Sequence, residues 1–100
     1  MPGFLQIMEF DTSRIEEVDA LARELVKEAG AGFLARKATT TEDRDRRGHY
    51  YVIVEFDSYE DAMKNSESPV VDKYAAKMGE LVGGPPTFRN LDVVSVQEVG

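Results

Sequence analysis

Several polar side chains of this sequence stand within apolar patterns, where binding and catalytic groups are commonly held. Tyr74 belongs to an apolar stripe at helical spacing, Gln6 alternates with apolar residues in a strand-like run, and Asn65 lies where a helical pattern breaks. Arg89 follows Phe88 just before the last apolar run. A tyrosine ring, an amide and a guanidinium could orient a planar phenolic ligand and stabilise its anion. We therefore predict an aromatic pocket in which Tyr74, Asn65 and Arg89 take part in catalysis.

Binding of a small aromatic ligand in this pocket is assigned to Gln6, Tyr51 and Phe88. Aromatic rings offer flat apolar walls, and an amide both donates and accepts hydrogen bonds. The alternative interpretation is that the tyrosines fill the core and its rim while Arg89 pairs with a carboxylate. The sequence leaves both interpretations open.

His49 is the one histidine of the chain and the candidate general base. The ordinary pKa of an imidazole, near 6.5, suits proton transfer at neutral pH. However, His49 follows Gly48 at the end of a polar segment that reads as a hairpin connection. This position favours a solvated loop histidine over a catalytic one.

Metal and cofactor sites have little support in the residue types available. Cysteine is absent, so disulfides, thiolate zinc sites and cysteine nucleophiles are excluded. The segment from Asp43 to Gly48 resembles half of a calcium loop, but Arg47 and Val54 stand where oxygen ligands are needed. Neither a G-x-S-x-G elbow nor a phosphate-binding lysine loop is present. We expect no metal and no cofactor.

The charge balance argues against a nucleic-acid partner. The chain carries 12 basic and 19 acidic residues, for a net charge of −7, whereas neutralising a phosphate backbone needs a Lys/Arg face. An apolar run of the roughly 20 residues that a membrane span needs is missing, and the first ten residues have no signal-peptide pattern. The sequence therefore predicts a cytoplasmic protein that binds neither nucleic acid nor membranes.

The hydrophobic periodicity indicates a single α+β domain over residues 1–100. Ser13 with Glu16 and Ser58 with Asp61 look like helix starts, and Pro69 should break the second helical region in two. The expected elements are strands over 4–10, 33–41, 49–56 and 91–99, a helix over 15–29, a short helix after Ser58 and another over 69–82. This β-α-β-β-α-β order predicts a ferredoxin-like plait, an antiparallel sheet with its helices on one face.

The strands are apolar on both faces, although helices can cover only one of them. The first strand offers Phe4 and Met8 on one side and Leu5 and Ile7 on the other. An exposed apolar sheet face usually marks an interface. We therefore expect a homodimer that packs sheet to sheet.

The run from Glu55 to Met63, followed by Asn65, Ser68-Pro69 and Tyr74, resembles antibiotic-biosynthesis-monooxygenase-type (ABM-like) domains. The order of elements and the helix break match this family along the whole chain. The resemblance implies a dimeric α+β barrel whose last strand reaches the partner. It also implies a ligand pocket between the helices and the sheet.

The resemblance further implies a small-molecule-binding homodimer that acts as a cofactor-independent monooxygenase on an aromatic or polyketide-like substrate. In that chemistry the substrate carbanion itself reduces dioxygen. Haem-degrading relatives hold iron with a histidine at a position near Ala75 here and use an asparagine near Gln6, so haem degradation is not expected. A non-catalytic binding or structural dimer and a polyketide cyclase-like protein remain alternatives.

Overall fold

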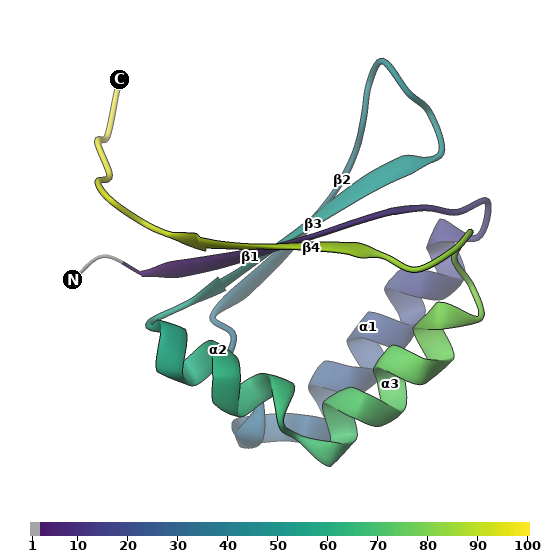
Figure 1. The fold of residues 1–100 in the computed structure, drawn as a ribbon, viewed down its shortest axis with the longest axis horizontal. Helices are drawn as coiled ribbons and strands as arrows, with labels where there is room; N and C mark the ends of the chain where they lie inside the picture. Colours follow the sequence, from purple (N-terminus) through teal and green to yellow (C-terminus); the bar gives the residue numbers. More distant parts are fainter. Residues whose placement is uncertain (1–2) are drawn as a thin grey trace.

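The computed structural model describes residues 3–100 and contains four strands and three α-helices (Figure 1). The elements are β1 (Phe4–Asp11), α1 (Ile15–Ala29), a short 3₁₀ helix (Gly30–Gly32), β2 (Lys37–Glu42), β3 (His49–Phe56), α2 (Tyr59–Ser66), α3 (Pro69–Gly79) and β4 (Thr87–Asp92). This order confirms the predicted α+β plait. No helix among these residues is long and apolar enough to cross a membrane.

The sheet is antiparallel with the strand order β2-β3-β1-β4. Helices α1 and α3 lie on one face of it, below the sheet in Figure 1. The register pairs Gln6 with Val54 on one side and with Asn90 on the other. Side chains alternate between the two faces along each strand, and residues paired across strands point to the same face. Gln6, Val54 and Asn90 therefore all lie on the helix side of the sheet.

Local sequence signals explain where most helices begin and end. The amide of Asp61 donates to Ser58 Oγ at 3.1 Å, so the expected cap of α2 is present. Pro69 is in the first turn of α3 and separates it from α2, as predicted. The capping box at Ser13 is wrong, because Arg14 is the N-cap residue and makes no side-chain cap. Instead, Thr12 Oγ1 accepts from the amide of Arg14 at 3.0 Å.

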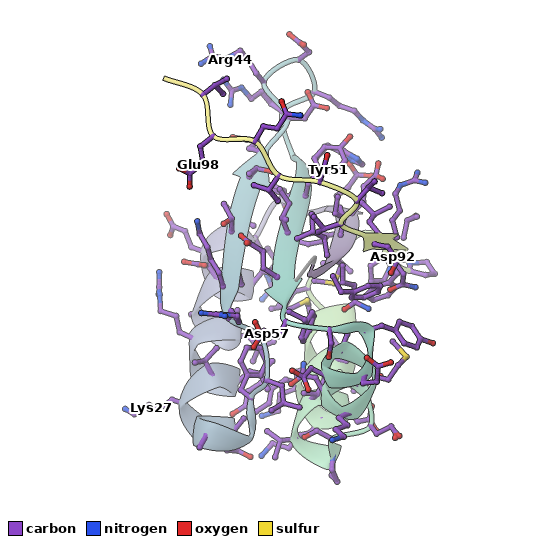
Figure 2. The ribbon with its side chains drawn as sticks, turned by 90° about the vertical axis from the view of Figure 1, so that its left-hand side faces the viewer. Lys27, Arg44, Tyr51, Asp57, Asp92 and Glu98 are labelled. Atoms are coloured by element: carbon purple, nitrogen blue, oxygen red, sulfur yellow. The ribbon has the colours of Figure 1, made fainter. Side chains whose placement is uncertain are left out.

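The last strand is shorter and begins earlier than predicted. β4 covers Thr87–Asp92 rather than residues 91–99. The register pairs Asp92 with Phe4, the first residue of β1, and the amide of Val93 donates to the carbonyl of Gly3 at 3.0 Å. The tail over residues 93–100 turns away from the helices (Figure 1), leaving β4 after Asp92 and passing Glu98 (Figure 2). Its valines at 94, 96 and 99 are exposed.

The hydrophobic core is divided into two clusters at opposite ends of β1 and β3. The cluster near α2 consists of Phe4, Phe56 and Ala62. The other cluster consists of Phe10, Val18 and Tyr50. Between them, the paired residues Gln6 and Val54 occupy the middle of the sheet. The centre of the helix side is therefore less densely filled than its two ends.

Candidate functional site

A cavity of about 280 Å³ lies between the helices and the sheet, where the two core clusters leave space. Residues of β1, β3 and β4 form its floor, and residues of α1, α2 and α3 form its walls. Its lining is mostly apolar, with a few polar groups. The members are Gln6, Met8, Leu21, Ala22, Leu25, Phe33, Val54, Phe56, Ala62, Asn65, Ser66, Val71, Asp72, Tyr74, Ala75, Met78 and Phe88.

Asn65 is the polar group most firmly held at this cavity. It lies near the end of α2 and is only 8% exposed. Its Oδ1 accepts a hydrogen bond from the amide of Leu34 at 3.2 Å. Because only the oxygen of the amide can accept, this bond orients the side chain and leaves the two Nδ2 hydrogens for a ligand. Asn65 thus ties the segment before β2 to α2 and offers a donor to the cavity.

A second amide group comes from the sheet. Gln6 Nε2 donates to Asn90 Oδ1 at 3.1 Å across the β1–β4 pair. Phe88 is 55% exposed and closes this side of the cavity beside β4. Gln6 and Phe88, two of the binding residues predicted from the sequence, both line the cavity.

Tyr74 contributes its ring to the cavity, but its hydroxyl is engaged elsewhere. Tyr74 Oη donates to Glu28 Oε1 on α1 at 2.9 Å, and Lys73 Nζ contacts the same carboxylate at 3.0 Å. This hydrogen bond and burial raise the pKa of Tyr74, while the bond from Lys73 lowers the pKa of Glu28. The buried ring therefore forms a wall, and the hydroxyl joins α3 to α1.

His49, Tyr51 and Arg89 lie away from this cavity, and none of them lines it. They occupy odd-numbered strand positions, whereas Gln6 and Val54 of the helix side are even-numbered. Alternation along paired strands therefore puts them on the sheet face without helices. The structure brings Gln6, Asn65, Tyr74 and Phe88 together and separates them from the other three predicted residues.

His49 is a buried strand residue, so the expectation of a solvated loop histidine is wrong. It begins β3 and is 5% exposed. Nδ1 lies 2.6 Å from Asp11 Oδ1, and Nε2 lies 2.6 Å from Glu9 Oε2. The hydrogen bond to Asp11 and then that to Glu9 raise the pKa of His49 above its usual value. With a carboxylate on each nitrogen, the imidazolium form is favoured, and this residue is poorly suited to be a base.

Arg89 and Tyr51 extend this charged group on the helix-free face. Arg89 Nη2 lies 3.8 Å from Glu9 Oε1, which is the carboxylate pairing considered as an alternative from the sequence. The ring of Tyr51 meets that of His49 edge-on, with centroids 5.2 Å apart. These residues therefore form one interacting group with Glu9 and Asp11.

The family model described as a domain of unknown function, DUF1330, matches residues 5–82 of the chain. This protein belongs to the DUF1330 family. Among curated protein sequences, none matches it.

Solved structures confirm the fold of this DUF1330 domain. A conserved protein from Methanosarcina mazei aligns with a TM-score of 0.76 and 9% identity, over 91% of this chain and 92% of that one. A candidate antibiotic biosynthesis monooxygenase from Caulobacter crescentus aligns with a TM-score of 0.75 and 17% identity, over 94% of this chain and 92% of that one. Rv0793 from Mycobacterium tuberculosis aligns with a TM-score of 0.71 and 20% identity, over 98% of this chain and 99% of that one. The predicted ABM-like, ferredoxin-like fold is thereby confirmed.

One ionisable residue of the cavity was missed by the sequence analysis. Asp72 lines the cavity from the first turn of α3. With Tyr74 it is one of the two ionisable groups among the lining residues of the DUF1330 domain. Carboxylates are common in the first helical turn for electrostatic reasons, so its position alone gave no signal. Its spacing of three residues from Ala75 of the apolar stripe could have indicated a shared helix face.

Proposed function

We propose that this DUF1330 protein binds a small, mainly apolar molecule in the cavity between its helices and its sheet. The observation that supports this function best is the interruption of the core, where a cavity of about 280 Å³ takes the place of packed side chains. Ligand pockets are commonly apolar and carry a few oriented polar groups. Here those groups are the amides of Asn65 and Gln6.

The amides indicate which part of a ligand they would hold. Among residues 3–100, the side chain of Asn65 makes one hydrogen bond, which its oxygen accepts from the amide of Leu34, so Nδ2 can donate to a ligand. A carbonyl oxygen is the matching acceptor. In a mostly apolar cavity such a bond is stronger than in water, so it would also stabilise negative charge that develops on that oxygen.

The activity that we propose is cofactor-independent monooxygenation of an aromatic or polyketide-like substrate. An activated methylene carbon loses a proton, and the carbanion transfers an electron to dioxygen. The two radicals combine to a peroxide, which loses water. The net change, CH₂ + O₂ → C=O + H₂O, balances because carbon loses the four electrons that oxygen gains. The fold shared with the Caulobacter crescentus protein supports this proposal.

Within that reaction, Asn65 and Gln6 orient the substrate oxygen, and the Tyr74 ring supports its flat face. Asp72 is the carboxylate on the cavity wall, and we assign it as the proton acceptor. His49 has no part in this step, since it lies on the opposite face between two carboxylates. A cyclase that uses His49 as its base is disfavoured for the same reason.

A non-catalytic binding protein is the second candidate function. It is favoured by the exposure of Asp72, because water then has access to the proposed proton acceptor. Oxygen uptake with a panel of anthrones, measured beside ligand binding, separates the two functions. We expect turnover in the wild type and at least a tenfold loss in Asp72→Asn with binding retained. Binding without turnover across the panel would establish the non-catalytic function, and absence of both would refute the proposal.

We also propose that the protein is a homodimer through the helix-free face of its sheet. Leu5, Ile7 and Ile53 lie on this face and are partly exposed, and Leu91 is exposed. The valine tail leaves the sheet on the same side (Figure 1). A specific interface buries at least about 1,000 Å² in total, and a four-stranded face with the tail can supply that area.

Analytical ultracentrifugation tests the dimer with one matched pair of variants. Ile53→Glu places a charge near the middle of the face and should give a monomer or an aggregate. Ala76→Glu adds the same charge at an exposed position of α3 and should remain dimeric. A well-folded wild-type monomer at micromolar concentration would refute the sheet-to-sheet dimer.

A further inference from the structure

A second cavity of about 370 Å³ adjoins the first beneath α1. The two share a central set of lining residues, namely Met8, Ala22, Leu25, Phe33, Val54 and Met78. The second cavity alone also reaches Val18, Val52, Ala38 and Thr40. The two cavities therefore lie side by side beneath the helices, and they are called the first and the second lobe.

The two lobes extend across the strands rather than along them. The first lobe reaches Phe88 on β4, and the second reaches Ala38 and Thr40 on β2. These strands are the two edges of the sheet. Adjacent strands are about 4.8 Å apart, so the path across four strands is about 14 Å, which is longer than a single aromatic ring. A compact single ring would occupy only one lobe.

Resting on the binding function proposed above, we infer that the ligand is an elongated, uncharged molecule with a carbonyl-bearing head and an alkyl tail. The head lies in the first lobe, where Asn65 Nδ2 donates to its oxygen. The tail crosses the shared central residues and enters the second lobe. This assignment names a ligand class, aryl or alkyl ketones with a long chain, rather than a compact phenol.

The charges of the first lobe select an uncharged head. Its described lining residues include the carboxylate of Asp72 and no lysine, arginine or histidine. The ammonium group of Lys73, the residue after Asp72, does not line the lobe and is paired with Glu28 at 3.0 Å. A carboxylate head would be desolvated without a cationic partner, which is strongly unfavourable. A ketone oxygen needs only the amide donor.

The second lobe suits an alkyl chain because its wall is largely aliphatic. Val18, Val52 and Ala38 contribute carbon surface, and the charged groups on the wall, Asp19 and Arg23, pair with each other on α1. Each methylene buried there should tighten binding about fourfold. A chain that stays outside in water would show no such increment.

A series of phenyl alkyl ketones from acetophenone to decanophenone tests the inference by isothermal titration calorimetry. In the wild type we expect affinity to rise about fourfold per methylene until the second lobe is filled. Decanoate, with a similar tail and a charged head, should bind at least tenfold more weakly than decanophenone. Equal or tighter binding of decanoate would overturn the uncharged head.

Two alanine-to-tryptophan variants place the tail and the head separately. Ala38→Trp fills the second lobe, and it should preserve acetophenone binding while removing the gain with chain length. Ala75→Trp fills the first lobe and should weaken every ketone. Both positions are exposed, and circular dichroism with thermal melts checks that each variant folds. Thr40→Trp, also at the second lobe, replaces Ala38→Trp if that variant does not fold.

The outcomes separate the ligand class from the binding function itself. Ketones that bind the wild type without a chain-length increment, or an increment that survives in Ala38→Trp, would overturn the elongated ligand and leave the proposed function in place. Ketones and anthrones that both fail to bind would refute the proposed function as well. A gain in ketone affinity with chain length that is present in the wild type and lost in Ala38→Trp would support both the elongated ligand and the binding function.

Discussion

Asn65→Ala should destabilise the protein and weaken ligand binding at the same time. The side chain of Asn65 is 8% exposed, and its Oδ1 accepts a hydrogen bond from the amide of Leu34 at 3.2 Å. The substitution removes this acceptor. Leaving a partly buried donor unpaired costs about 1–2 kcal/mol. For a domain of this size, that loss lowers the thermal midpoint by roughly 4–16 °C.

Asn65→Asp separates the two roles of this side chain. The carboxylate keeps an oxygen for the Leu34 amide, and the charge-assisted bond offsets part of the desolvation of the charge. We therefore expect a smaller loss of stability than in Asn65→Ala. The donor to the ligand is gone in both variants, so the affinity for decanophenone should fall about tenfold or more in each.

Differential scanning calorimetry and ligand titration measure the two effects, with Lys64→Ala as the neighbouring control. Lys64 is an exposed residue of α2 and does not line the cavity, so its loss should change the midpoint and the affinity little. Both roles of Asn65 would be refuted if Asn65→Ala had the same thermal midpoint as the control and bound decanophenone as tightly as the wild type.

Three further outcomes follow from the same structure. Because the pKa of His49 is raised, its stabilisation is fully present below pH about 6.5 and is lost as pH rises through the folded-state value; urea midpoints from acidic to basic pH should show this slope, and His49→Gln should flatten it. Tyr74→Phe breaks the bond to Glu28 but keeps the ring, so thermal melts should show reduced stability while ketone affinity is preserved. Phe10→Ala should cost about 3–5 kcal/mol in denaturant unfolding, whereas Phe88→Ala, at a position 55% exposed, should cost much less.

The residues on the helix side of the sheet could be predicted because successive side chains of a strand point to opposite faces. Gln6 is two residues from both Phe4 and Met8, so the three share one face, and the register places Gln6 opposite Val54. Pro69 likewise acts locally, since it lacks the amide that a continuous helix would use. Its break determines where α2 ends, and hence where Asn65 stands.

Other outcomes depended on contacts between distant parts of the chain. The partners of His49 are Glu9 and Asp11, about forty positions earlier, and strand pairing is what places them around it. The polar residues next to His49 in the sequence therefore suggested exposure to solvent, whereas the strand pairing buries its ring between two carboxylates. The bounds of β4 were mispredicted for a similar reason, because they depend on its pairing with the distant strand β1, from Glu9 with Thr87 to Phe4 with Asp92.

The sequence by itself determined the elements, their order and the alternation that separates the two faces, because those features arise from local backbone preferences and hydrophobic periodicity. Tertiary structure alone decided that the core divides into two clusters with a cavity between them. It also decided that Asp72 reaches this cavity while Arg89 does not. The packing of helices against a twisted sheet depends on the combined volumes of side chains at many positions that are far apart in the sequence. A local sequence pattern therefore does not predict where a cavity remains.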